Sequence, residues 1–287
     1  MGEKTYAIQE FYKEKLFVEM HYSMGYRGMS QMHFHDGYEI WVSLSDGAKF
    51  YIEDQIYPVN RGGVMLVNNM EVHKATLPEE IEHVRYIVSF VPEYIAEYDY
   101  GDGALFRAFI NRPLGITHCI QLEEEQLTEI LNLIRMLQKY TERKGDDNEQ
   151  LKKHCLAQLV VFCNMYYERG DYFRPGESSK VLKPIISYIK KNIAQQLPLG
   201  ELAATFYMSK MHLIRLFKAE MGMTPNEYII MVRIQQARFY LAEGMPVIKV
   251  CEMVGYADES HFIRTFKKIM GITPKQYGKL RREGKEV

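Results

Sequence analysis

Four side chains that can bind a metal ion or hydrogen-bond a polar ligand fall close together early in the chain. His33 and His35 alternate along a stretch predicted to be extended, so both imidazoles point to the same side. Glu39 follows across a short bend, and His73 belongs to a later predicted strand. Three imidazoles and one carboxylate are a ligand set that divalent transition metals accept. The same groups can instead line a pocket for a small polar molecule, or serve only the structure.

The elements around these residues are predicted to be short strands, which cover residues 5–95. Residues 38–44 alternate, with Tyr38, Ile40, Val42 and Leu44 on one face. Similar β-branched and aromatic runs, separated by Gly, Pro and Asn turns, occupy 48–52, 64–67 and 84–91. Strands this short and closely spaced are typical of a small sandwich or barrel.

The spacing H-x-H-x(3)-E followed by a distant His resembles the cupin signature, and the short strands agree with a cupin-like β-barrel. The second half of that signature is poorer, because Asn69-Met70-Glu71 stands where a Pro-x-Gly turn is expected. Aromatic side chains suited to stacking on a sugar lie nearby in the sequence, although ordinary core packing explains them equally well: Tyr38, Trp41 and Phe50.

The pattern becomes helical after residue 105. Apolar side chains recur every three or four residues over 122–143 and again over 149–168, which predicts two antiparallel amphipathic helices. They can cover the barrel or pair with a second copy of the chain. Residues 170–179 contain Pro, Gly and Ser and read as a linker. We therefore divide the chain into 1–100 (barrel), 101–172 (helices), 173–180 (linker) and 181–287.

Charge separates the two halves. The chain has 287 residues and a net charge of −1, yet residues 177–287 hold 18 Lys and Arg against 10 Asp and Glu. This basic half predicts a polyanionic partner. No apolar run approaches the roughly 18 residues of a membrane span, and the four scattered cysteines indicate reduced thiols in the cytoplasm. No Gly-rich phosphate loop or G-x-S-x-G motif indicates catalysis.

An internal repeat dominates the basic half. Residues 209–228 match 258–277 at ten of twenty positions, so one supersecondary unit occurs twice. In each copy a glycine, Gly222 or Gly271, occupies the position of a left-handed helix cap, and a Thr-Pro pair begins the next helix. A short apolar helix, 199–206 or 247–254, precedes each repeated helix. This order predicts two helix-turn-helix units, the second with a turn one residue longer.

Each repeated helix has a basic outer face. Leu213, Leu216 and Phe217 are predicted to face inward in the first copy, as are Phe262, Thr265 and Phe266 in the second. The opposite face carries Arg and Lys in both copies and suits a DNA major groove, although a solvated basic face is the alternative. The helix predicted over 224–243 spans about 30 Å, close to one DNA turn of roughly 34 Å.

Residues 181–282 resemble the DNA-binding domain of the AraC/XylS family of bacterial transcription regulators. The resemblance rests on LAATFYMSKMHLIRLFKAEMGMTPNEYI and VCEMVGYADESHFIRTFKKIMGITPKQY. It implies DNA contacts at ten positions: Ser209, Lys210, Met211, Arg215, Lys218, Glu259, Ser260, His261, Arg264 and Lys267. This sequence has Cys251 where the family usually has Ala, and Glu259 would repel a phosphate or accept from a cytosine amine.

The resemblance implies an α+β chain with an N-terminal cupin-like sensor, a helical pair for dimerisation and a double helix-turn-helix domain. It also implies a cytoplasmic activator without a cofactor, which binds promoter DNA and RNA polymerase and responds to a sugar or oligosaccharide. The candidate effector residues are His33, His35, Glu39, Trp41 and His73. Two alternatives stay open: a metal-dependent cupin enzyme that uses His33, His35, Glu39 and His73 as ligands, and a regulator without a ligand.

Overall fold

The computed structural model contains two compact units. It describes residues 16–23, 32–53, 55–77, 82–101, 103–112, 118–143, 145–170, 172–173 and 180–282. The chain divides between Ser178 and Ser179, and residues 32 and 33 group with the C-terminal unit. We call residues 34–173, together with 16–23, the barrel unit, and residues 180–282 the helical unit. Each is described by itself.

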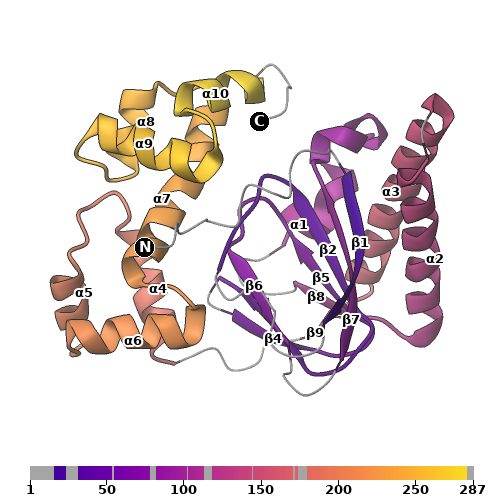
Figure 1. Ribbon diagram of the computed structural model, residues 1–287, viewed down its shortest axis with the longest axis horizontal. Coiled ribbons are helices and arrows are strands. Elements are labelled where there is room, and N and C mark those ends of the chain that lie inside the picture. The colour runs from indigo at the N-terminus through magenta and orange to yellow at the C-terminus, as the bar shows by residue number, and fades with distance from the viewer. Residues whose placement is uncertain are drawn as a thin grey trace. The chain divides into compact units, whose positions relative to one another are not determined.

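Two antiparallel sheets form the barrel unit (Figure 1). The six-stranded sheet has the order β1-β7-β2-β5-β8-β9 and the three-stranded sheet the order β4-β3-β6. The strands are β1 (Leu16–Ser23), β2 (Tyr38–Ser43), β3 (Ala48–Ile52), β4 (Gln55–Val59), β5 (Gly63–Val67), β6 (His73–Thr76), β7 (His83–Phe90), β8 (Cys119–Gln121) and β9 (Tyr172–Phe173). Apolar side chains of both sheets share one core, among them Trp41, Phe50 and Met65.

The alternation predicted along β2 is present and separates two cores. Ile40 and Val42 pack toward the helices, whereas Trp41 packs between the two sheets. Tyr38 lies on the helical side and stacks on Phe109, with ring centroids 4.9 Å apart. Tyr38, one of the aromatic residues that the sequence suggested for stacking on a sugar, therefore faces away from Glu39, because adjacent residues of a strand face opposite sides.

Two long helices cover the outer face of the six-stranded sheet. They are α2 (Glu124–Thr141) and α3 (Asp146–Glu168), and their apolar stripes share a core with β2, β5 and β7. The helix expected over 149–168 begins three residues earlier, where Gly145 adopts φ 122° and three acidic residues occupy the first turn. Shorter helices precede them: η1 (Pro92–Tyr98), η2 (Ala104–Phe106) and α1 (Arg107–Ile110).

The range 101–172, expected to be helical, also contains a strand. β8 pairs with β5 through Val64 and Ile120 and so belongs to the barrel sheet. Three residues are too few to show a periodicity, which is why the sequence pattern did not indicate this strand.

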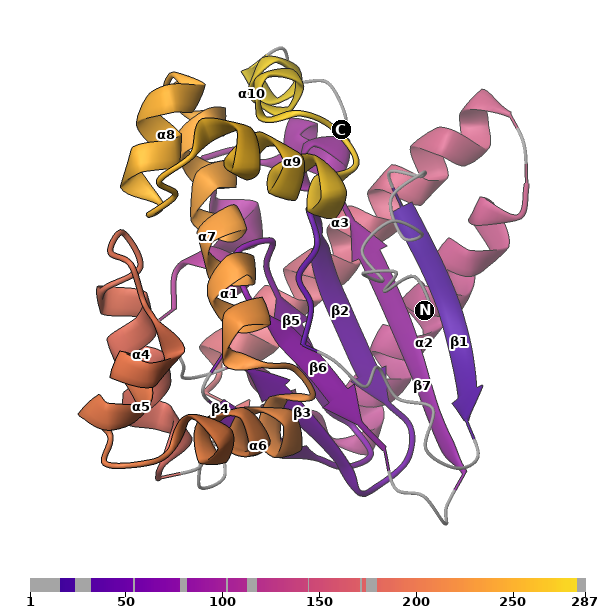
Figure 2. The same ribbon diagram turned by 60° about the vertical axis from the view of Figure 1, so that its left-hand side comes forward.

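The helical unit consists of seven helices within its described residues 180–282 (Figure 2). They are α4 (Leu182–Lys191), α5 (Leu199–Thr205), α6 (Lys210–Met221), α7 (Pro225–Ala242), α8 (Val247–Met253), α9 (Glu259–Met270) and α10 (Pro274–Arg282). Both views show α6 and α9 at opposite ends of α7. Four residues separate α5 from α6 and five separate α8 from α9, as the sequence predicted.

None of the helices in the described ranges is both long enough and apolar enough to cross a membrane.

Candidate functional site

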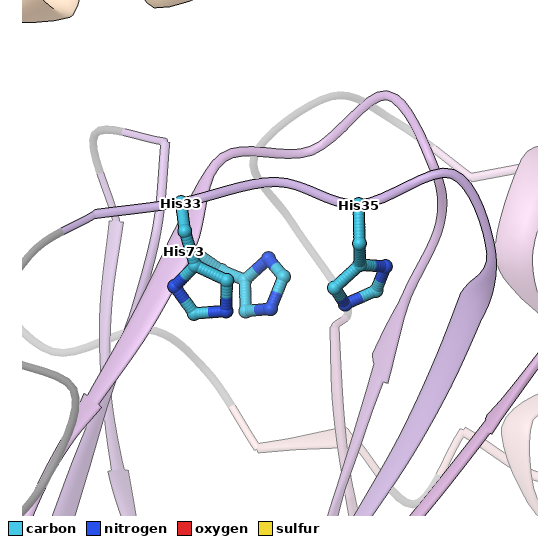
Figure 3. Close-up of side chains that lie close together, drawn as sticks. All are labelled: His33, His35 and His73. Atoms are coloured by element: carbon cyan, nitrogen blue, oxygen red, sulfur yellow. The ribbon is translucent and has the colours of Figure 1, made fainter. Parts of the chain in front are cut away.

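The His and Glu side chains singled out in the sequence meet at one end of β2. His35 Nε2 lies 3.3 Å from one carboxylate oxygen of Glu39, and His73 Nε2 lies 3.9 Å from the other. Residues 33–35 precede β2 rather than belonging to a strand, but the bend does bring Glu39 to His35 as expected. His33, His35 and His73 offer ring nitrogens within 4.8 Å of one another (Figure 3).

Aromatic side chains hold one wall of this cluster. The Phe50 ring stacks on His73, with centroids 5.7 Å apart and an angle of 5° between the planes. Trp41 contacts Phe50 edge-on at 5.5 Å and is buried in the core between the sheets. The sequence analysis placed Trp41 among the candidate effector residues. In the structure Trp41 contacts Phe50, and Phe50 in turn contacts His73 of the cluster.

A second buried polar cluster adjoins the first and was not anticipated. The Glu71 carboxylate pairs with Arg112 and lies 3.3 Å from Nδ1 of His118, while its backbone carbonyl lies 3.1 Å from Nδ1 of His73. All of these side chains are buried. The only sequence signal was Glu71 itself, at the position where the cupin signature has a turn glycine.

Burial sets the ionisation of the second cluster. It lowers the pKa of His118 to about 2, with a further contribution from the Arg112 charge, so this imidazole is neutral. Burial raises the pKa of Glu71, and Arg112 opposes part of that shift. Nε of Arg112 and Nε2 of His118 are buried without a hydrogen-bond partner in the described part of the chain.

Another buried histidine lies at the far end of β2. His83 Nε2 is 3.2 Å from the Ser43 hydroxyl, and its ring stacks on Trp41 at 5.6 Å. Burial, followed by the charge of Arg85, lowers the pKa of His83 to about 4. His83 therefore provides a buried imidazole of the same barrel that takes no part in the Glu39 cluster.

The repeated helices of the helical unit end at the predicted glycine caps, and they begin at side-chain caps that the sequence analysis did not predict. The side chains of Ser209 and Asp258 accept from the backbone amides of His212 and His261 at the starts of α6 and α9. Gly222 and Gly271 end these helices with φ of 75° and 77°. Reciprocal capping boxes, Thr224 with Glu227 and Thr273 with Gln276, follow each glycine.

The ten residues assigned to DNA from the resemblance are all exposed. Of the residues predicted to face inward, Leu213, Phe217, Phe262 and Phe266 are buried, whereas Leu216 and Thr265 are only partly buried. Ser209 has a structural role as well, because its hydroxyl caps α6. Each α6 and α9 surface thus presents one Arg and one Lys in register, which suits contact with a phosphate backbone and base edges.

Comparison with known proteins finds a matching family model for each of the two units. The family model described as AraC-like ligand binding domain matches residues 20–160, and the one described as Helix-turn-helix domain matches residues 202–280. The chain belongs to the AraC family of transcriptional regulators. An AraC-family chain of this kind binds DNA through its helix-turn-helix units and a small molecule through its N-terminal domain.

Three relatives illustrate the similarity. An HTH-type transcriptional regulator of Bacillus subtilis, YbfI, is 27% identical over 258 residues, which cover 85% of each chain. The transcriptional activator RhaR of Mannheimia succiniciproducens is 21% identical and covers 90% of this chain and 88% of its own. The lactose operon transcription activator of Staphylococcus xylosus is 23% identical over 137 residues, 47% of this chain and 49% of its own.

Proposed function

We propose that this AraC-family regulator is a transcription activator that responds to a sugar or oligosaccharide bound inside the barrel unit. The observation that carries the proposal is the pair of adjoining buried polar clusters around Glu39 and Glu71. Buried polar groups need hydrogen-bond partners, and a sugar offers several hydroxyl groups. Two relatives are named as activators, one of them of a lactose operon.

The proposed effector residues are His33, His35, Glu39, Trp41 and His73, to which the structure adds Arg112 and His118. Arg112 Nε and His118 Nε2 lack partners among the described residues, and Glu71 connects them to His73. We therefore expect effector hydroxyls to satisfy these nitrogens when the ligand is bound. Catalytic turnover of the sugar forms no part of this proposal.

The proposed DNA surface comprises the exposed faces of α6 and α9. The contacts are assigned to the ten residues named above, from Ser209 to Lys218 and from Glu259 to Lys267. α7, between the two helices, has 18 residues, or about 27 Å at 1.5 Å per residue. This length favours two contacts on one side of promoter DNA, roughly one turn apart. RNA polymerase is the proposed partner of the bound activator in the cytoplasm.

The proposed dimer interface is the outer face of α3. Leu151, Val161 and Met165 are exposed there and fall within one narrow arc of the helix. Substituting Val161 by Glu should convert a dimer into a monomer in analytical ultracentrifugation, without loss of secondary structure. A wild-type chain that sediments as a monomer at micromolar concentration contradicts this part of the proposal.

The effector hypothesis is tested by His35→Ala, with His83→Gln as the matched control. A thermal-shift screen of common mono- and disaccharides, lactose included, first identifies a sugar that raises the melting temperature, since binding to the folded state stabilises it. His35→Ala should lose that shift and the induction of a reporter while retaining operator affinity. His83→Gln should keep all three. Normal induction by folded His35→Ala removes His35 from the effector site.

A further inference from the structure

Arg233 lies at the middle of α7, the helix that connects the two helix-turn-helix copies. Its side chain is only 9% exposed, and its guanidinium donates to two carbonyl oxygens of residues 192–198, which we call the entry segment because they lead from α4 into α5. Nε lies 3.2 Å from the oxygen of Ile193, and Nη2 lies 2.6 Å from that of Gln195. The planar fork of an arginine suits two acceptors at a fixed separation. The charged group is thus held by the segment that enters the first copy.

The second copy meets the same guanidinium. Its central carbon lies 5.5 Å from the centre of the Tyr256 ring, in the turn between α8 and α9, which is within the range of a cation–π contact. A Cβ atom on Gly255 would lie 2.9 Å from Nη2, so the backbone of this turn packs directly on the charged group. Nε2 of Gln196, in the entry segment, donates to the carbonyl oxygen of Gly255 at 3.0 Å. We call Gln196, Arg233, Gly255 and Tyr256 the junction.

The junction extends to the first turn of α9. The Tyr256 ring contacts the His261 ring edge-on at 5.4 Å and the Phe262 ring at 5.3 Å. Phe262 is buried, whereas His261 is exposed on the surface assigned to DNA. A shift of Tyr256 would therefore move the end of α9 that is proposed to contact DNA.

Two connections between the copies fix their relative orientation better than one. α10 holds the second copy to the C-terminal part of α7 through Arg282, which donates to the Leu241 carbonyl, and α7 in turn leads back to the first copy. The junction adds a direct contact between the turn of the second copy and the entry segment. Burying a guanidinium costs free energy that an apolar side chain would avoid. The directional hydrogen bonds of the guanidinium, which an apolar side chain cannot make, explain its use at this position.

We propose that Arg233 is a positioning residue for DNA recognition, which holds α9 at a fixed position relative to α6 through the junction. The consequence for DNA rests on the proposed function, in which both helices contact one duplex. When two contacts share a rigid frame that matches the duplex, the second contact forms at a high effective concentration. A looser junction therefore weakens binding to two half-sites but leaves binding to the half-site of α6 unchanged.

The test uses the full-length protein and a duplex that wild-type protein selects from a random library. One derivative of this duplex has the half-site of α9 scrambled, identified as the half-site whose changes Arg264→Ala no longer distinguishes. The other derivative has one base pair inserted between the half-sites. Arg233→Lys keeps the charge but cannot hold both carbonyls. Gln196→Ala removes a contact at the edge of the junction, and Gln195→Ala, which leaves its backbone carbonyl in place, is the matched control.

Fluorescence anisotropy with the three duplexes separates positioning from stability. Arg233→Lys should bind the selected duplex roughly tenfold more weakly, since it loses part of the gain from a shared frame, and should bind the scrambled duplex like wild type. The inserted base pair turns the second half-site by roughly 35°, because a DNA turn has about 10 base pairs. This insertion should weaken binding by wild-type protein more than binding by Arg233→Lys. Gln196→Ala should change in the same direction by a smaller factor, and Gln195→Ala should behave like wild type.

Hydrogen exchange without DNA tests the positioning itself. Backbone amides of residues 255–262 should exchange faster in Arg233→Lys, whereas those of α6 should not change. Equal exchange in the two proteins, or a loss of affinity by the same factor on all three duplexes, would overturn the proposal. Wild-type protein that binds the selected and scrambled duplexes equally refutes the two-copy DNA surface of the proposed function, and the exchange result then decides the role of Arg233.

Discussion

The two helix-turn-helix copies make the same turn with different residues. After α5, Tyr207 adopts φ 54°, and its amide and that of Met208 donate to Ala204 and Ala203. After α8, Gly255 adopts φ 80°, and its amide and that of Tyr256 donate to Glu252 and Cys251. Both patterns are Schellman motifs. The additional residue of the second copy is inserted after this shared turn.

The surroundings of the two turns explain why only one of them needs glycine. Tyr207 is 100% exposed, so its side chain meets nothing. A Cβ atom on Gly255 would lie 2.5 Å from the carbonyl oxygen of Ile193, in the segment after α4. Positive φ alone is therefore tolerated by tyrosine. Glycine is required where another part of the backbone packs directly against the turn.

Among the substitutions that test this comparison, Gly255→Ala should have the largest effect on the free energy of unfolding. The new methyl group overlaps the Ile193 carbonyl and imposes positive φ on alanine, for an expected loss of about 3 kcal/mol in the free energy of unfolding. Urea denaturation measures it. The matched control is Gly200→Ala in α5, where a Cβ meets no atom within 4 Å and helix propensity predicts a gain of about 0.5–1 kcal/mol. Equal behaviour of the two variants would disprove the packing explanation.

Arg215→Ala and Arg264→Ala test whether the two copies contribute equally to DNA recognition. If each guanidinium contacts a base edge, each substitution should cost roughly 1–3 kcal/mol of binding free energy on the operator and less on random DNA. Fluorescence anisotropy with both duplexes at one salt concentration provides the measurement. An equal loss on both duplexes would reassign that arginine to a phosphate contact.

Ser209→Ala and Asp258→Ala compare the N-terminal caps of α6 and α9. Each removes the acceptor for one backbone amide at a helix start, at a cost of about 1 kcal/mol in unfolding free energy. The loss should be larger for Asp258, because its charge also interacts favourably with the helix dipole. Repeating the denaturation in high salt should narrow the difference. A difference that persists unchanged in high salt would argue against the dipole contribution.

Tyr207→Gly should have the smallest effect on the free energy of unfolding, and it should stabilise the protein rather than destabilise it. Glycine removes the cost of the left-handed conformation, which is roughly 1–2 kcal/mol for an L-residue. Glycine also loses more conformational entropy on folding, which costs about 0.5–1 kcal/mol. The net expectation is a stabilisation of about 0.5 kcal/mol, seen as a higher urea midpoint. A clear destabilisation would show that the Tyr207 side chain contributes to the folded unit despite its exposure.

The helical unit was largely predictable because its signals are local. Each cap, such as Thr224 with Glu227, lies within three residues of the amide that it satisfies. The spacing of apolar residues that predicts Phe217 to be buried and Lys218 to be exposed also repeats within one or two turns of the helix. Sequence patterns of this range report directly on the helix.

The barrel site was predictable only in part, because its partners lie far apart in the chain. The bend that joins His35 to Glu39 is local and was found, as was the contribution of His73. The cluster of Glu71, Arg112 and His118 was missed, since 41 residues separate Glu71 from Arg112. No residue pattern connects positions at that separation.

The burial of α7 has a consequence for how promoters can vary. Arg233 of α7 donates to the carbonyls of Ile193 and Gln195 on one side, and Arg238 donates to Tyr277 on the other. These contacts tie α7 to the segment between α4 and α5 and to α10. Inserting or deleting a single residue in α7 would turn the second copy by about 100° relative to the first. If both copies bind DNA as proposed, the length of α7 fixes the spacing between the two half-sites of an operator, and mutation can more easily change the base sequence of each half-site than the distance between them.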